Sequence, residues 1–197
     1  MTALDCAQIA LASGQIVVLT GDRFRRGDID FVVSAAHVTP AAINFMATHG
    51  RGLICLAITQ QRALQLGIGL VNAGGDRQSG RPFGRSIEAR EGVSTGISAA
   101  DRALTVAIAV APETTADDLI SPGHVFPLIT AAGGIVERPA AAEAAVALCR
   151  RAGAGDAAVI CSIMRDDGEM ARAKDVVALA TLHELPLVSI DELLAAL

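Results

Sequence analysis

Residues 39–66, TPAAINFMATHGRGLICLAITQQRALQL, contain two helix patterns with a strand pattern between them. Thr39 and Pro40 have the order of an N-cap and a first helical residue, and Gly50 follows the last turn of that pattern. Residues 53–59 form a continuous apolar run that suits a buried strand, and residues 60–66 favour a helix. This alternation predicts an α/β fold.

The same alternation extends to both ends of the chain, and we expect one domain over residues 1–197. The predicted helices cover 1–13, 140–152, 170–182 and 191–197, and the predicted strands cover 15–19, 85–89, 157–164 and 187–190. Ser98 and Asp101 have the spacing of a capping box, so a helix should begin near Ala99, with an N-terminus that could hold an anion. Segments 20–30 and 71–83 are polar and contain glycines, which predicts an exposed loop and a long mobile loop.

Composition and charge exclude several classes of partner. The chain has 16 basic and 21 acidic side chains and a net charge of −5, which argues against a nucleic-acid surface. Its apolar runs are interrupted before they reach the length of a bilayer span, so we expect no membrane partner. The first residues contain no basic region followed by a cleavage site, which favours the cytoplasm. The sequence contains no C-x-x-C pair, so it predicts neither a zinc site nor a redox motif.

Four stretches, taken in this order and spacing, resemble the 3,4-dihydroxy-2-butanone 4-phosphate synthase family of riboflavin biosynthesis. They are RGLIC at 51–55, GVSTGISAADR at 92–102, PGHVFPL at 122–128 and GGIVERPAAAEAAV at 133–146. The resemblance implies a single-domain α/β sandwich, usually a homodimer with its active site near the subunit interface. It also implies conversion of ribulose 5-phosphate with release of C4 as formate, assisted by a magnesium-type ion and several carboxylates that move protons.

The acidic loop that this family uses is altered. The family pattern is an Asp, three intervening residues, then Arg-Glu-x-Glu-Gly-Asp, whereas residues 19–28 read LTGDRFRRGD. Arg23 and Asp28 fit the pattern. The leading Asp is Leu19, the metal-binding Glu is Phe24 and the second catalytic Glu is Arg26.

The motif that supplies the second metal ligand is altered as well. Its pattern, Arg-x-Gly-His-Thr-Glu-Ala, reads RPAAAEA at 138–144, so Arg138 and Glu143 are retained and the metal-binding His is Ala141. A further catalytic Glu is replaced by Ser162. Because neither Phe24 nor Ala141 can coordinate magnesium, we expect no metal ion and no other cofactor.

The residues that we expect to carry chemistry are those that match family positions, together with the arginines of the altered loop. The candidate acids and bases are Asp28, His124 and Glu143. The candidate substrate contacts are Arg23, Arg25, Arg26, Cys55, Thr95, Asp101, Arg102 and Arg138.

Structural roles remain open for most of these residues. Cys55 can act as a small buried hydrophobe, Asp101 and Arg102 can cap a helix, and the arginines of segment 23–26 can be solvated. His124 can make a hydrogen bond within a turn. We interpret His37, His49 and His183 as ordinary surface residues.

The leading hypothesis is a divergent family member that binds a small phosphorylated or carboxylated metabolite. It would catalyse a metal-independent rearrangement, elimination or condensation. A rival hypothesis is a catalytically silent homologue that binds a ligand or a partner subunit. A third is ordinary formate-releasing synthase activity with repositioned ligands.

Overall fold

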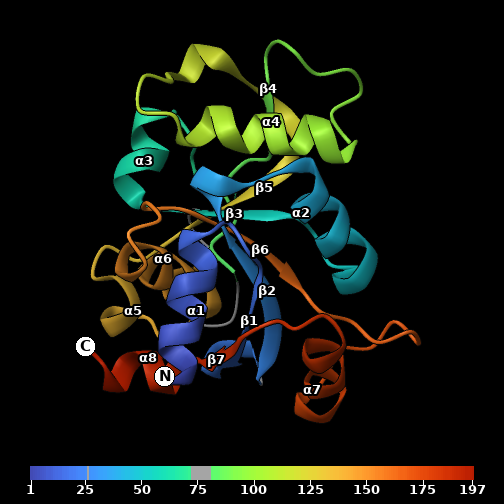
Figure 1. Ribbon diagram of the computed structural model, residues 1–197. Coiled ribbons are helices and arrows are strands. Elements are labelled where there is room, and N and C mark those ends of the chain that lie inside the picture. Colours follow the sequence, from blue (N-terminus) through green and yellow to red (C-terminus); the bar gives the residue numbers. More distant parts are fainter. Residues whose placement is uncertain (26, 72–80) are drawn as a thin grey trace.

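The computed structural model describes residues 1–25, 27–71 and 81–197 (Figure 1). These residues form a seven-stranded sheet with the order β4-β5-β3-β6-β2-β1-β7. The strand β3 is parallel to β5 and β1 is parallel to β7, whereas the other neighbouring pairs are antiparallel. The strands are β1 (Val17–Asp22), β2 (Asp28–Ser34), β3 (Cys55–Ile58), β4 (Ile87–Ala89), β5 (Leu119–Ile129), β6 (Ala158–Ser162) and β7 (Leu187–Ser189).

Helices cover both faces of the sheet, which confirms the predicted α/β sandwich. Figure 1 shows α2 and α4 on one side of the sheet and α1, α5 and α6 on the other. The described helices are α1 (Ala3–Ala12), α2 (Pro40–Phe45), α3 (Gln60–Gln65), α4 (Ala99–Val110), α5 (Gly134–Glu137), α6 (Ala141–Arg151), α7 (Ala173–Leu182) and α8 (Ile190–Ala195). None of them is long and apolar enough to cross a bilayer.

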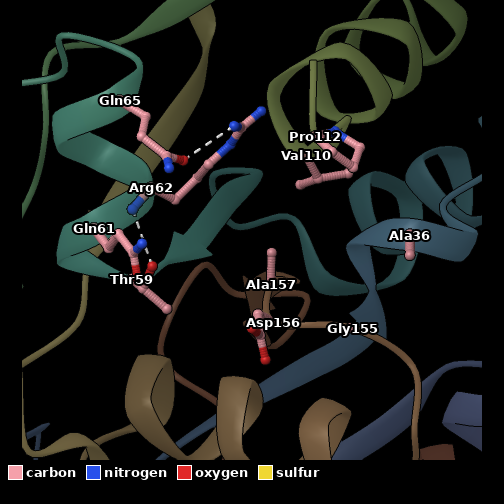
Figure 2. A pocket seen from close by; sticks show the side chains of 10 residues that line it. All are labelled: Ala36, Thr59, Gln61, Arg62, Gln65, Val110, Pro112, Gly155, Asp156 and Ala157. Atoms are coloured by element: carbon pink, nitrogen blue, oxygen red, sulfur yellow. Dashed lines mark hydrogen bonds between the residues drawn. The ribbon is translucent and has the colours of Figure 1, made fainter. Parts of the chain in front are cut away.

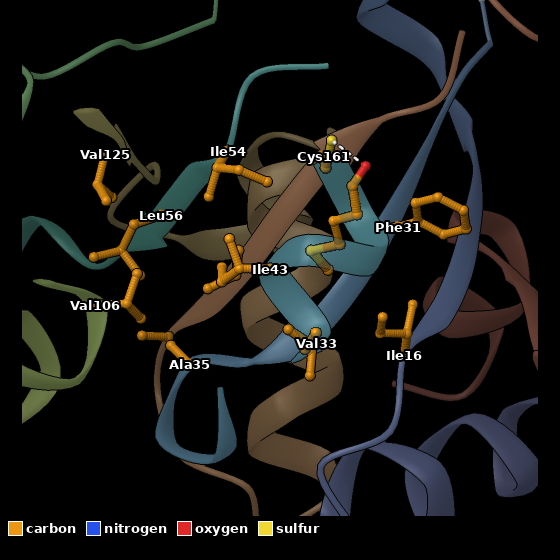
Figure 3. Packing of buried hydrophobic residues seen from close by; sticks show 14 of the residues in the cluster. Ile16, Phe31, Val33, Ala35, Ile43, Ile54, Leu56, Val106, Val125 and Cys161 are labelled. Carbon is orange, nitrogen blue, oxygen red and sulfur yellow. Dashed lines mark hydrogen bonds between the residues drawn. The ribbon is translucent and has the colours of Figure 1, made fainter. Parts of the chain in front are cut away.

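Each face of the sheet packs into its own apolar cluster. In β2, Phe31 and Val33 enter one cluster, which also includes Ile43 of α2 and Val106 of α4 (Figure 3). Val32 points the other way, into the cluster under α1, α6 and α8, because successive strand side chains face opposite sides. Complete burial of such a side chain stabilises the fold by about 1.5–3 kcal/mol.

The predicted start of α2 is confirmed, but its end differs from the prediction. The side-chain oxygen of Thr39 accepts a hydrogen bond from the backbone N–H of Ala42 at 3.1 Å, and Pro40 is the first helical residue. After Phe45 the chain continues as a π-helical turn over Met46–Gly50. Arg51 then has a φ of 63°, which places the left-handed residue one position after the expected glycine.

The prediction of an exposed loop over 20–30 is wrong at both ends of the segment, whereas Arg23 and Phe24 in its middle are exposed. Strand β1 continues to Asp22, a short 3-10 turn covers Arg23–Arg25, and β2 begins at Asp28. Asp22, Asp28 and Asp30 are all buried. Their polar side chains interrupt the hydropathy pattern of two strand ends, which explains why the sequence resembles a loop.

The strand β5 was not predicted at all. Its sequence contains Pro122, Gly123 and Pro127, which are residues that normally interrupt strands. It nevertheless pairs with β3 on one side and β4 on the other. Of the predicted mobile loop at 71–83, residues 72–80 lie outside the described part of the chain, and Phe83 forms an isolated bridge with Leu128.

Candidate functional site

Several polar side chains lie at one end of the sheet, where β1 and β6 end and where β2 and β3 begin. In the strand register, Asp22 faces Asp28 and Asp30 faces Ser162. Cys55, the first residue of β3, pairs with β6 two residues before Ser162. The fold therefore brings polar and reactive side chains from four strands to the same end of the sheet.

Asp22 connects two segments of the chain that are far apart in sequence. Its Oδ1 accepts a hydrogen bond from the backbone N–H of Phe24 at 2.9 Å, and its Oδ2 accepts one from the N–H of Ala141 at 3.0 Å. Ala140, the N-cap residue of α6, has no side chain that can cap the helix, so Asp22 provides the cap from β1. One carboxylate thus holds the backbones of residues 24 and 141 together.

Glu143 and Arg138 lie beside this junction. Glu143 Oε1 accepts hydrogen bonds from the backbone N–H of Ala131 at 3.0 Å and from Arg138 Nη1 at 3.4 Å. Burial raises the pKa of Glu143, although the Ala131 hydrogen bond and the Arg138 charge act in the opposite direction. The Arg138 guanidinium also lies 5.4 Å from the centre of the Phe24 ring, a cation–π distance.

A second ion pair is buried next to these residues. Arg81 Nη2 donates hydrogen bonds to Asp30 Oδ1 at 3.0 Å and to Ser162 Oγ at 2.6 Å, and Ser162 Oγ donates to Asp30 Oδ1 at 2.7 Å. The side chains of Arg81 and Asp30 are only 10% and 1% exposed. The sequence singled out Ser162 only as the replacement of a catalytic Glu, and it gave no sign of Arg81 or Asp30, because Arg81 belongs to a segment that was interpreted as a loop and Asp30 interrupts an apolar strand.

Cys55 borders this ion pair. Burial raises the pKa of its thiol to about 12; the Arg81 charge opposes the shift and the Asp30 charge adds to it. The thiol is therefore protonated near neutral pH, which agrees with the interpretation of Cys55 as a small buried hydrophobe.

His124 belongs to a separate group of residues near the start of α4. Its Nδ1 lies 2.8 Å from Glu88 Oε2, and the side chain of Glu88 is 10% exposed while that of His124 is 43% exposed. Gly96, at a φ of +79°, lies against this pair, because a Cβ at Gly96 would lie 1.5 Å from Glu88 Oε1. Position 96 thus has no room for a side chain.

Asp101 fixes the same turn. Its Oδ2 accepts hydrogen bonds from the N–H of Gly96 and from Ser94 Oγ, both at 3.0 Å. Ser98 caps α4 through the N–H of Asp101, and the helix begins at Ala99 as predicted. The capping box itself is incomplete, because the Asp101 carboxylate binds Gly96 instead of the N–H of Ser98.

Of the three arginines of the altered loop, Arg23 has a described side chain, and its partner is an acid of α8. Arg23 is exposed and forms an ion pair with Asp191 of α8 at 2.6 Å. Arg25 ends the 3-10 turn, and Arg26 lies outside the described residues.

The remaining candidates are spread over both groups. Asp28 is buried and its Oδ1 lies 3.9 Å from Arg172 Nη1. Thr95 is exposed in the turn before α4, and Arg102 is half-buried in its first turn. The hydrogen bonds described above connect Arg138 with Glu143, and His124 with Glu88, but they do not connect one group with the other.

The model of the 3,4-dihydroxy-2-butanone 4-phosphate synthase family matches residues 6–196. The chain belongs to this family. It is 44% identical over 186 residues to the riboflavin biosynthesis protein RibBA of Aquifex aeolicus, which covers 93% of this chain and 46% of that protein. It is 42% identical over 181 residues to the synthase of Photobacterium phosphoreum, covering 92% and 50% respectively. The chain thus spans about half the length of these curated relatives.

Solved structures of the family have the same fold. A two-domain synthase from A. baumannii, RibBX, superimposes with a TM-score of 0.90 at 38% identity, over 96% of this chain and 56% of that chain. A synthase structure in complex with two magnesium ions superimposes with a TM-score of 0.90 at 33% identity, over 98% and 94%.

The residues of this family member do not fit a magnesium site at the position that the resemblance implies. Phe24 and Ala141 offer neither oxygen nor imidazole ligands. Ala141 and Ala142 are instead buried in the apolar cluster under α6. Within the described residues, no group of three or more His, Cys, Asp or Glu side chains could hold a metal ion.

A pocket of about 360 Å³ lies at the opposite end of the sheet, where β3 ends and β6 begins (Figure 2). None of the predicted site residues in the described part of the chain lines it. Arg62, on its wall, donates hydrogen bonds to the backbone oxygens of Ala109, at 2.9 Å, and Ala111. Its guanidinium thereby binds the C-terminal end of α4, which gives it a structural role.

Two of the histidines differ from their interpretation as surface residues. The His49 and His183 rings are 4.6 Å apart, and each also contacts the Phe45 ring, at 4.5 and 5.0 Å between centroids. Both side chains are half-buried in this cluster, whereas His37 is exposed as expected.

Proposed function

We propose that this family member binds a small phosphorylated or carboxylated metabolite near Arg138 and catalyses a metal-independent rearrangement, elimination or condensation. The observation that carries this proposal is the contact of Asp22 with both Phe24 and Ala141. It supports the view that the two positions used for metal in the family pattern are neighbours here, with side chains that cannot bind magnesium.

The chemistry available around this junction is that of an anion site with a proton carrier. Arg138 would contact the anionic group of the ligand through its guanidinium. Glu143, whose pKa is raised by burial, would take up and release a proton closer to neutral pH than an exposed carboxyl does. Asp28 and His124 are the other proposed proton carriers.

The proposal includes a cytoplasmic homodimer with lyase-type activity, in which residues 1–197 act as one domain. The separation of the His124 group from the Arg138 group supports a dimer, since a second copy could bring the two groups together. The four cysteines are free and three of them are buried, which is compatible with a reducing compartment.

The alternative is a catalytically silent homologue that binds a ligand or a partner subunit. It is favoured by the structural contacts that several candidates make, such as Arg23 with Asp191 and Asp101 with Gly96. The two functions differ in turnover, because a silent homologue converts no ligand that it binds.

Calorimetric titration with ribulose 5-phosphate and with inorganic phosphate, in the presence of EDTA, tests the binding step. Arg138→Gln should weaken binding of both compounds about tenfold or more, because it removes a charge-assisted contact. The matched control is Arg150→Gln, which removes an exposed arginine paired with Asp156 and should leave binding unchanged. Equal binding by Arg138→Gln and the unmodified protein, or no binding of either compound, would contradict the proposed function.

A further inference from the structure

The buried group of Asp30, Arg81 and Ser162 has no role in the function proposed so far. The neighbouring residues on the same face of these strands, Val32 and Ile160, are fully buried and apolar. Desolvation of a carboxylate and a guanidinium costs several kcal/mol per ion, and an apolar pair of similar volume is often as stable. Packing alone therefore does not explain a charge pair at this position.

The hydrogen bonds within this group determine which ligand atoms it can still bind. Ser162 Oγ donates its single proton to Asp30 and accepts a hydrogen bond from Arg81, which leaves one lone pair. Asp30 Oδ1 accepts from both partners, whereas the buried Oδ2 has no hydrogen-bond partner in the described part of the chain. The unused positions on Asp30 and Ser162 are acceptors, so a ligand group that binds them must be a donor.

The location connects this group with the anion site. Asp30 faces Ser162 directly across β2 and β6, so it places a carboxylate opposite the position at which the family pattern has a catalytic Glu. Burial lowers the pKa of Arg81, but the charge and hydrogen bond of Asp30 and the charge of Asp22 raise it, and the overall shift is upward. Arg81 therefore stays charged, and it lies within electrostatic reach of the carboxylate that caps α6.

We propose that Asp30, Arg81 and Ser162 form a hydroxyl-binding subsite in which Asp30 Oδ2 and Ser162 Oγ accept hydrogen bonds from a ligand hydroxyl group. This inference rests on the proposed function, because the anionic end of the same ligand binds near Arg138. It restricts the ligand to phosphates or carboxylates that carry hydroxyl groups. Arg81, whose guanidinium is buried against Asp30, disfavours a metal ion at this subsite because it is a positive charge.

The test compares two probes that differ in their hydroxyl groups, erythritol 4-phosphate and n-butyl phosphate. Calorimetry gives the ratio of their dissociation constants for the unmodified protein and for Ser162→Ala, Asp30→Asn and the control Ser13→Ala, which changes an exposed serine. We expect the unmodified protein and Ser13→Ala to bind the hydroxylated probe about tenfold more tightly than the alkyl probe. Ser162→Ala and Asp30→Asn should bring the ratio close to one and leave the affinity for n-butyl phosphate unchanged.

The experiment distinguishes a failure of the hydroxyl-binding subsite from a failure of the proposed function. Equal binding of both probes by the unmodified protein, or an unchanged ratio in Ser162→Ala, would overturn the subsite while the anion site stands. Absence of binding for both probes would overturn the proposed function and the subsite with it. Circular dichroism checks the fold of each variant, and Ser162→Ala alone decides the test if Asp30→Asn does not fold.

Discussion

Replacement of Asp22 by Ala removes the carboxylate that holds β1 against the start of α6. Two backbone N–H groups, those of Phe24 and Ala141, lose a charged acceptor. A hydrogen bond to a charged group is worth about 1.5–3 kcal/mol. Water can replace part of the bond to Phe24, which is 39% exposed, but not the bond to Ala141, which is 2% exposed. We therefore expect the free energy of unfolding to fall by about 3 kcal/mol.

Urea unfolding at pH 7 measures this loss, and Asp5→Ala is the matched control. Asp5 also accepts a backbone hydrogen bond at a helix start, from Thr2 at 2.8 Å, but it is exposed. Its removal should lower the free energy of unfolding clearly less than the removal of Asp22, because water can replace the exposed carboxylate. Asp22→Asn should lie between the two, because its amide offers one acceptor oxygen. A loss of stability in Asp22→Ala that is no larger than the loss in Asp5→Ala would contradict the role of Asp22 as the cap of α6.

Gly96→Ala should destabilise the protein more than Gly153→Ala. Both glycines have a positive φ, but only at Gly96 would the added Cβ clash with a side chain, that of Glu88. Thermal unfolding of the two variants measures the difference. Burial and the charges of His183 and Arg51 lower the pKa of His49 below 6.5, so the unfolded chain binds more protons and stability should fall as pH drops below that value. Urea unfolding from pH 5 to 8 should show a smaller loss for His49→Gln, and an unchanged slope would contradict this. The buried Cys55 thiol, with a pKa of about 12, should react with a disulfide reagent only after unfolding, whereas rapid labelling in the native protein would show that it is accessible.

Sequence reasoning succeeded where local signals determine the structure. Thr39 and Pro40 mark the start of α2 through their own side chains, and Ser98 marks the start of α4 in the same way. The α/β class follows from apolar periodicity, which is a property of short windows. These features need no information about residues far away in sequence.

The errors arise where distant residues decide the structure. Asp22 is buried because Ala141, 119 residues later, needs an acceptor for its N–H. Asp30 is tolerated in β2 because Arg81 and Ser162 bind it from two other segments. Neither partnership leaves a pattern in the local sequence, so segment 20–30 was predicted to be a loop.

The candidate site was predicted in part. The altered positions 24 and 141 were identified from the family pattern. In the structure, the backbone N–H groups of both residues donate to the carboxylate of Asp22. Arg23 forms an ion pair with Asp191 of α8, and its contact with a substrate stays a prediction. An exposed arginine can pair with any nearby acid, and the sequence contains no signal that selects one.

The proposed function requires that this chain does not catalyse the metal-dependent reaction of the family. Incubation of the purified chain with ribulose 5-phosphate and magnesium, followed by quantification of formate, measures that reaction directly. We predict no formate above the level of a protein-free control. Magnesium-dependent formate release that is abolished by EDTA would contradict the account, because it would require metal ligands other than residues 24 and 141.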